Sequence, residues 1–234
     1  MIRTLVIPVL NELDGIKLIM PSIKPEWYDQ LLFIDGESTD GTQEYLKEKG
    51  YPFYVQKKRG MRHAYTESWP LIKGDVVLTF SPDGNSIPEL IPLCFDKMKE
   101  GYDMVIVSRY KDTAKSEDDD FLTGIGNWCF TKMIGILHGF PYTDAMVIYR
   151  AYKTKLAYDL DLMNDKHFQW EENLFNTRVS WEPLLSIRAA KRKLKIAEIP
   201  GDEPPRVFGK RKLQVWKWGA VFLVQTIREI FVWR

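Results

Sequence analysis

The sequence predicts an α/β fold in which helices flank a mostly parallel central sheet. Short apolar runs alternate with segments of helical spacing through the first half of the chain, a pattern typical of repeated strand–helix units. These runs lack the alternating polar positions of half-exposed strands, which indicates strands that are buried on both faces. The chain has 234 residues, of which 45% are hydrophobic, and this suffices for one large domain or two small ones.

The first half of the chain is expected to contain five strands and four helices. The apolar runs that predict strands lie at residues 5–7, 31–34, 53–55, 76–80 and 104–107. The segments with helical spacing between them lie at residues 13–21, 41–49, 62–71 and 88–100. Asp40 and Ser86 precede two of these helices and are residue types that cap helix N-termini.

The second half of the chain is less regular. The expected elements are an acidic, mobile loop at 116–120, helices at about 126–137 and 182–193, and strands at 145–149 and 195–199. The paired prolines of the loop at 201–205 stop any helix. An amphipathic helix follows them. We therefore expect one domain at residues 1–212 and a C-terminal amphipathic helix at residues 213–234.

The net charge of +1 hides an uneven distribution along the chain. Residues 188–234 carry twelve Lys and Arg against four Asp and Glu, whereas the remainder carries twenty-one against twenty-eight. The same segment holds three of the eight tryptophans. A basic, Trp-rich end on an acidic body indicates a surface that meets phosphates, membrane or both. Nucleic acid is not an expected partner, because the body is acidic and no nucleic-acid motif occurs.

Several protein classes are excluded by what the sequence lacks. Cys94 and Cys129 have neither metal-ligand nor disulfide spacing, so a reducing cytoplasm is the expected compartment. The apolar start of the chain predicts a strand and is too short for a signal peptide. No apolar run reaches the roughly 18 residues that a membrane-spanning helix needs. There is no P-loop motif, and Gly124-Ile125-Gly126 does not follow a strand as a dinucleotide fingerprint would.

Carboxylates and small polar residues follow three of the expected strands. Glu12 follows the first, Asp35 and Asp40 follow the second, and Asp83 and Asn85 follow the fourth. Because ligands of such sheets bind at the carboxyl ends of the strands, these side chains are expected at one site. Their oxygens suit a nucleotide, and Asp83 and Asn85 can supply two ligands to Mg²⁺ or Mn²⁺ beside a diphosphate. The alternative is that the aspartates only cap helices or shape turns.

Six segments match one family in order along the chain. They are IPVLNE at 7–12, IDGESTDGT at 34–42, Arg59-Gly60 with Ala64, SRY at 108–110, TDAM at 143–146 followed by YRA at 149–151, and RVFGKRK at 206–212. With them the chain resembles a family 2 glycosyltransferase with the GT-A nucleotide-sugar-binding fold. Within that family it is most similar to dolichyl-phosphate mannose synthase and the bacterial polyprenyl-phosphate glycosyltransferases.

The resemblance implies an enzyme that moves a sugar from a nucleoside-diphosphate sugar to an acceptor, with inversion at the anomeric carbon. The residues that it implies for donor binding are Pro8, Leu10, Glu12, Asp35, Ser81, Pro82, Asp83 and Arg109. Those that it implies for binding phosphate or acceptor are Arg206, Arg211 and Lys212.

The resemblance also implies a divalent cation, Mg²⁺ or Mn²⁺, held by Asp83 and Asn85. Here the sequence departs from the family, because Ser81 stands where the first carboxylate of an Asp-x-Asp metal motif is expected. This loss should weaken metal binding without abolishing it, since diphosphate oxygens and water complete the coordination shell. It also leaves open a non-catalytic module that only binds sugar nucleotides.

The need for a catalytic base depends on the acceptor. A lipid phosphate is already ionised near neutral pH, whereas a sugar hydroxyl needs a carboxylate within hydrogen-bond reach. Asp144 is the favoured candidate because it opens a strand-like run, and Glu182 is the second unless it is merely an exposed residue at a helix start. Glu171 and Glu172 are weaker candidates. Transfer to a glycan hydroxyl therefore remains the alternative to transfer to a lipid phosphate.

The C-terminal helix combines Trp, Phe and Ile with basic residues. This composition suits a helix that lies in the membrane interface, where a lipid phosphate acceptor resides. The expected partners are therefore a nucleoside-diphosphate sugar, a lipid phosphate and the cytoplasmic face of a membrane, contacted peripherally. The alternative is that the helix packs on its own domain or on a second copy in a homo-oligomer.

Overall fold

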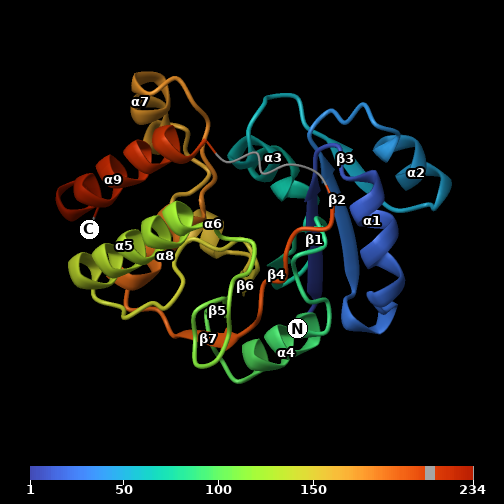
Figure 1. Ribbon diagram of the computed structural model, residues 1–234, viewed down its shortest axis with the longest axis horizontal. Helices are drawn as coiled ribbons and strands as arrows, with labels where there is room; N and C mark the ends of the chain where they lie inside the picture. Colours follow the sequence, from blue (N-terminus) through green and yellow to red (C-terminus); the bar gives the residue numbers. More distant parts are fainter. Residues whose placement is uncertain (209–213, 234) are drawn as a thin grey trace.

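A seven-stranded sheet forms the centre of the computed structural model, which describes residues 1–208 and 214–233 (Figure 1). The strand order is β3-β2-β1-β4-β6-β5-β7. The strands are β1 (Arg3–Val9), β2 (Gln30–Asp35), β3 (Phe53–Val55), β4 (Val76–Thr79), β5 (Met104–Ser108), β6 (Arg150–Lys153) and β7 (Ile196–Pro200). Strand β6 is antiparallel to its neighbours β4 and β5, and the other neighbouring pairs are parallel. The predicted α/β fold with a mostly parallel sheet is confirmed.

The helices gather in groups on the two sides of this sheet. Those in the described part of the chain are α1 (Leu13–Ile19), α2 (Thr42–Glu48), α3 (Met61–Ser68), α4 (Leu90–Lys99), α5 (Phe121–His138), α6 (Leu156–Asp159), α7 (Lys166–Leu174), α8 (Glu182–Lys191) and α9 (Val215–Phe231). In Figure 1, α1 and α2 lie beside β1 to β3, whereas α5, α8 and α9 lie together on the opposite side. Helix α9 contacts α5, α7 and α8.

The apolar runs of the first half form strands at the predicted places because both faces of the sheet are covered. Leu5, Val6 and Ile7 of β1 are completely buried, and so are Val77 and Leu78 of β4. The main driving force for assembling these elements is the burial of apolar side chains. It contributes about 25 cal/mol of stabilisation per Å² of apolar surface removed from water. Strand β7 also lies within one residue of its predicted position.

The strand predicted at residues 145–149 is wrong: this segment is irregular, and the strand begins at Arg150. The reason is the Arg150 side chain, which is fully buried. Its guanidinium donates to the carbonyl oxygens of Ala145 and Val147, at 3.2 Å for Ala145 and 2.7 Å from Nε to Val147. These carbonyls face the arginine instead of a neighbouring strand. The apolar run therefore folds around the Arg150 guanidinium.

The structure differs from two other predictions near the acidic loop. Helix α5 begins at Phe121, five residues before the predicted start, because the Asp120 side chain caps it by accepting from the Thr123 amide at 2.8 Å. The acidic loop at 116–120 is anchored, since Ser116 pairs with Glu203 in an isolated β-bridge and the Glu117 amide donates to the Glu203 carbonyl at 2.8 Å.

Helix α9 is joined to the domain by a buried ion pair. Arg188 of α8 and Glu229 of α9 are both completely buried. The arginine donates through Nε and Nη2 to the two carboxylate oxygens at 3.0 and 3.1 Å. Burial alone would raise the pKa of Glu229, but hydrogen bonds and charge from Arg188 and Arg228 lower it below the ordinary glutamate value. One face of the predicted C-terminal helix is therefore part of the domain packing.

We predict that Glu229→Gln lowers the free energy of unfolding by about 3 kcal/mol, because it leaves the Arg188 guanidinium buried without a countercharge. Urea denaturation measures this loss, and Glu48→Gln, which alters an exposed pair with Lys49, is the control that should change little. The pKa of Glu229 is lowered in the folded state. Its carboxylate therefore adds to the free energy of unfolding at any pH above the unfolded pKa of about 4.3, and this contribution disappears as the pH falls through the folded pKa. An equal loss at neutral and strongly acidic pH would contradict the prediction.

Candidate functional site

A cavity of about 980 Å³ lies where the carboxyl ends of the strands meet α3, α5, α8 and α9. Loops that follow β1, β4 and β5 contribute one part of its wall. The short polar segments after these strands reach the same edge because the strands are parallel, as expected for ligand sites on such sheets. The sequence-predicted residues that line the cavity are Pro8, Leu10, Glu12, Ser81, Pro82, Asp83, Asn85, Arg109, Glu182 and Arg206.

Two of the predicted residues that the structure describes do not line the cavity. Asp144 and Asp35 lie in the structure behind its wall, and both are completely buried. Arg211 and Lys212 lie outside the described residues. Their proposed contacts with phosphate stay predictions.

Asp83 is a buried carboxylate with one oxygen held and one oxygen without a hydrogen bond. Its Oδ2 lies 2.9 Å from Nη2 of Arg206, and its buried Oδ1 has no partner. The neighbouring Asn85 is buried as well. An unsatisfied buried carboxylate oxygen beside an amide carbonyl is a donor set that suits a hard divalent cation.

The protein supplies few metal ligands at this place. Among residues 1–208 and 214–233, no group of three or more His, Cys, Asp or Glu side chains is arranged to hold a metal ion. Ser81 provides no carboxylate here. Asp83 and Asn85 therefore fit a cation whose remaining ligands come from a bound diphosphate and water, as in sites that take Mg²⁺ from a nucleotide.

Arg109 is fixed by carboxylates on two sides. Its Nε lies 2.6 Å from Oδ2 of Asp144, its Nη2 lies 3.2 Å from Oδ1 of the same residue, and its Nη1 lies 3.1 Å from Oε2 of Glu203. Burial alone would lower the pKa of Arg109, but Asp144 and Glu203 raise it well above the ordinary value. The guanidinium is therefore permanently charged and held toward the cavity.

Asp144 has its carboxylate committed to Arg109 through this two-pronged pair. Such a geometry leaves it poorly placed to take a proton from a group in the cavity. Glu182, in contrast, opens α8 and lines the cavity while being 2% exposed, and its Oε1 has no hydrogen-bond partner. The alternative that Glu182 is merely exposed at a helix start is therefore wrong.

The weaker base candidates have structural partners. Glu172 pairs with Arg62 at 2.9 Å in the buried space between α3 and α7, and Glu171 pairs with Arg228 of α9. Burial raises the pKa of Glu171 despite this arginine. Both carboxylates connect helices and do not line the cavity.

Asp35 and Asp40 organise the loops that form the cavity edge. Asp35 Oδ2 accepts from Gln43 at 2.6 Å and from the Ser38 amide at 3.0 Å. Asp40 accepts from the first amides of both α1 and α2, those of Leu13 and Thr42, at 3.1 and 3.0 Å. The capping alternative holds for Asp40. Asp35 combines a structural contact with a buried Oδ1 that has no partner.

Sequence reasoning missed several cavity residues. Asp118, Asp119 and Glu203 reach the cavity from segments that were expected to be loops only, and Arg59 and Arg178 reach it from the α3 and α7 side. The Arg206 amide donates to Asp118 at 3.2 Å, so the acidic loop and Arg206 belong to one wall. An acidic run in one loop and the basic residue Arg206 after the other were the available signal, but spacing alone does not pair loops that are distant along the chain.

The sequence matches known glycosyltransferases over most of its length. The profile of the family described as Glycosyl transferase family 2 matches residues 4–160. Glycosyltransferase AglJ of Haloferax volcanii is 27% identical over 224 residues, covering 95% of this chain and 70% of that protein. A dolichyl-phosphate hexose transferase of the same organism is 30% identical over 191 residues, covering 82% and 76%. An undecaprenyl-phosphate 4-deoxy-4-formamido-L-arabinose transferase of Klebsiella pneumoniae is 25% identical over 221 residues, covering 89% and 62%.

The fold matches a solved structure as well. Glucosyl-3-phosphoglycerate synthase from Mycobacterium tuberculosis, crystallised with Mn²⁺, uridine diphosphate and glucosyl-3-phosphoglycerate, superposes with a TM-score of 0.65. The match covers 98% of this chain and 79% of that chain at 17% identity. At this identity it supports a shared fold and no shared activity. Together with the family match, it confirms the predicted GT-A fold.

We predict that Asp144→Asn destabilises the protein by about 3 kcal/mol, because it leaves Arg109 largely buried with only partial compensation from Glu203 and Asp119. Urea denaturation measures the change. Asp96→Asn, which breaks an exposed contact with Lys99, is the matched control and should leave stability nearly unchanged. Equal stability of the two variants would show that the Arg109 pair contributes no more than a surface pair.

Proposed function

Since this chain belongs to glycosyl transferase family 2 and is a glycosyltransferase, we propose that it moves a sugar from a nucleoside-diphosphate sugar to a polyprenyl-phosphate lipid, with inversion at the anomeric carbon. The observation that carries the proposal is the two-part lining of the cavity. Asp83, Arg109 and Arg206 line one part, and the rings of Phe130, Trp218 and Phe222 line another. An acceptor with a phosphate head and an apolar chain matches both parts.

The donor nucleotide belongs at the strand ends in this proposal. Pro8, Leu10 and Glu12 follow β1 and line the cavity, and Asp35 supports the same edge from β2. Carboxylates at this edge can accept hydrogen bonds from the base and the ribose. The diphosphate then lies toward Asp83 and Arg109.

A divalent cation is part of the proposal, with Mg²⁺ and Mn²⁺ both suitable. Asp83 Oδ1 and the side-chain oxygen of Asn85 would hold it, because the first is buried without a partner and the second belongs to a buried residue two positions along the chain that lines the same cavity. When bound, such an ion neutralises negative charge on the diphosphate. Arg206 now lies 2.9 Å from Asp83, so its guanidinium and the ion would share one carboxylate.

The fixed arginines provide the main electrostatic contribution of the protein. Negative charge builds on the leaving diphosphate as its bond to the sugar breaks, and preorganised cations nearby stabilise that charge. Arg109 is held by Asp144 and Glu203 before any substrate arrives, so it needs little reorganisation during the reaction. We propose that Asp144 positions Arg109 and that the ionised acceptor phosphate attacks without a base.

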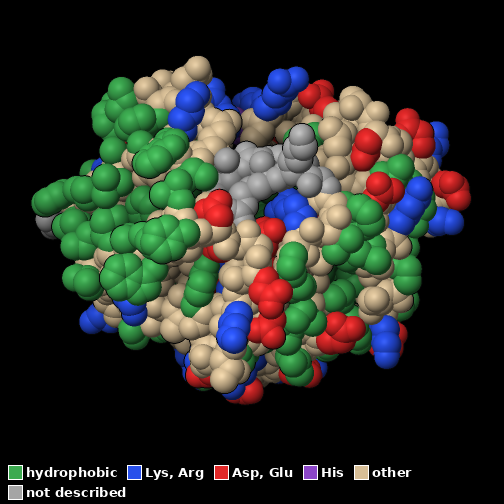
Figure 2. Space-filling view, in the orientation of Figure 1, with side chains coloured by type: hydrophobic (Ala, Val, Ile, Leu, Met, Phe, Trp, Pro, Cys, Tyr) green, Lys and Arg blue, Asp and Glu red, His purple; other side chains and the backbone are tan. Residues whose placement is uncertain are grey.

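Contact with a membrane surface follows from the acceptor and from the exposed side chains near the apolar part of the cavity. Phe121 and Trp128 of α5 are 86% and 63% exposed, and Trp216 and Phe231 of α9 are 79% and 73% exposed. Figure 2 shows apolar side chains gathered on the side of the molecule where Figure 1 places α5 and α9. No helix among the described residues has the length and apolarity to cross a bilayer. We propose that this surface, formed by α5 and α9, lies on the membrane.

Transfer to a glycan hydroxyl is the second candidate, and Glu182 favours it. This carboxylate lines the cavity with an unpartnered buried oxygen, which is the position a base for a hydroxyl acceptor would take. The two candidates differ in their acceptor and share the donor site.

We predict that Mn²⁺ increases the thermal stabilisation by one nucleoside diphosphate and that Asp83→Ala removes this increase, because it deletes the unpartnered metal ligand. A thermal-shift screen measures both effects, with Asp96→Ala as a control at an exposed carboxylate. Sugar transfer to polyprenyl phosphate should fall by about a hundredfold in Asp83→Ala. Transfer to a glycan only would support the second candidate, and donor binding without any turnover would indicate a binding module.

We predict that Trp128→Ala with Trp216→Ala reduces co-sedimentation with phosphatidylglycerol vesicles by about tenfold or more, because it removes two exposed rings from the α5–α9 surface. Point variants are preferable to deletion of α9, which would uncover Arg188. The control is Leu93→Ala, an exposed apolar residue of α4. Unchanged vesicle binding by the double variant would contradict the membrane contact and leave the sugar-transfer proposal intact.

A further inference from the structure

An aromatic cluster lies behind the part of the cavity wall that Glu182 forms. It consists of Tyr65 from α3, Trp69 just after α3, Tyr152 from β6 and Trp181 just before α8. All four side chains are 2% exposed or less. Tyr65 stacks on Trp181 with ring centres 4.8 Å apart, and Trp69 meets Trp181 edge-on at 4.9 Å. The rings therefore hold one another in fixed orientations.

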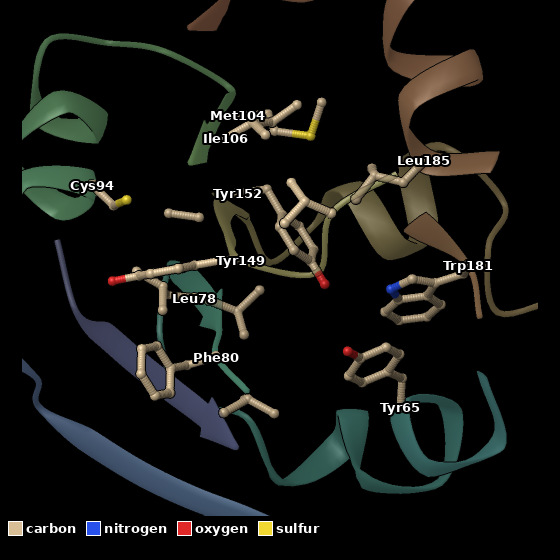
Figure 3. Packing of buried hydrophobic residues seen from close by; sticks show 14 of the residues in the cluster. Tyr65, Leu78, Phe80, Cys94, Met104, Ile106, Tyr149, Tyr152, Trp181 and Leu185 are labelled. Carbon is tan, nitrogen blue, oxygen red and sulfur yellow. The ribbon is translucent and has the colours of Figure 1, made fainter. Parts of the chain in front are cut away.

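The polar atoms of this cluster have no hydrogen-bond partner at ordinary distance and angle within the described protein. They are the hydroxyls of Tyr65 and Tyr152 and the indole nitrogens of Trp69 and Trp181. Figure 3 shows the polar ends of Tyr65, Tyr152 and Trp181 pointing toward one space between them. Buried donors are rarely left unsatisfied in proteins, because each costs about 1–3 kcal/mol. Several in one place need a common explanation.

The Glu182 carboxylate is the complementary group. Its buried Oε1 is an acceptor without a partner, whereas the cluster contains hydroxyl and indole donors. Burial raises the pKa of Tyr65 well above the ordinary value, and the neighbouring Glu182 charge raises it further. The pKa of Tyr152 is raised by the same two causes in the same order, while Arg150 opposes the rise for both tyrosines. Both hydroxyls are therefore donors at any working pH.

We propose that Tyr65 is a positioning residue for Glu182, and that its hydroxyl, supported by Tyr152 and Trp181, holds the buried oxygen of the carboxylate directly or through one water. This arrangement fixes the orientation of the Glu182 carboxylate at the cavity wall and leaves its other oxygen for a sugar hydroxyl of a bound substrate. The activity part of this inference rests on the proposed function, whereas the link between Tyr65 and Glu182 does not.

The link is tested without any substrate by a double-mutant cycle. Tyr65→Phe, Glu182→Gln and the double variant are compared by urea denaturation at neutral pH. The proposal expects a lower midpoint for Tyr65→Phe, and a shift of the double variant that is clearly smaller than the sum of the single shifts. A midpoint of Tyr65→Phe equal to or above that of the wild type, with additive shifts, would overturn the proposal, because an isolated buried hydroxyl costs stability.

The positioning role has its own readout in the pH dependence of turnover. Tyr65→Phe should lower kcat about tenfold with little change in donor KM, since a hydrogen bond to a charged group is lost. The acid limb of the kcat profile should move up by about one pH unit, because the carboxylate loses a donor that favours its ionised form. If the acid limb of Tyr65→Phe coincides with that of the wild type, Tyr65 contributes packing only and does not position Glu182.

Tyr142→Phe is the matched control for both experiments. Tyr142 is as buried as Tyr65, but its hydroxyl donates to the Ser186 carbonyl at 2.8 Å. Its replacement should lower the urea midpoint without moving the acid limb. If no acceptor supports turnover, the proposed function fails while the denaturation cycle still decides the link between Tyr65 and Glu182.

Discussion

The fully buried guanidinium of Arg150 is the constraint on which the site depends. It is held by the carbonyls of Ala145 and Val147 and by the Ser186 hydroxyl at 2.9 Å, and it approaches the Glu182 carbonyl at 3.4 Å. A buried cation is tolerated only when its donors are satisfied, so these groups must stay in place. One side chain thereby fixes both the irregular segment before β6 and the start of α8. Asp144, which pairs with Arg109, immediately precedes the first of these, and Glu182 begins the second, so these two carboxylates share one anchor.

The sheet was predictable from sequence because burial on both faces leaves a plain signal. Runs such as 31–34 and 104–107 contain only apolar residues, and their positions hold in β2 and β5. The run at 145–149 carries the same signal and fails, since local carbonyls bind the Arg150 side chain more readily than a neighbouring strand. An apolar run indicates that its residues are buried, but it does not specify their backbone conformation. Buried residues can form a strand or a loop that surrounds a cation.

The sequence predicted many residues of the site correctly, but it predicted their roles less well. Strand ends gather at one edge for a topological reason, so Asp83 and Glu12 were found without knowledge of any contact. The partner of a carboxylate depends on loops that are distant in sequence, and this is why Asp144 proved to be paired with Arg109 while Glu182 was not. The basic C-terminal segment is a similar case. Arg188, Arg228 and Lys191 are used in packing α9, so much of the positive charge there serves the fold.

Helix α9 has a consequence for the order in which the protein is made. A ribosome that has synthesised residues 1–208 has produced every strand of the described sheet, yet the aromatic wall from Trp218 and Phe222 is still missing. Until α9 arrives, Arg188 has no carboxylate partner on that side and the nascent chain keeps an uncovered cation beside apolar surface. The sheet can therefore form during translation before the cavity has its complete wall, and docking of α9 completes both the core and the cavity.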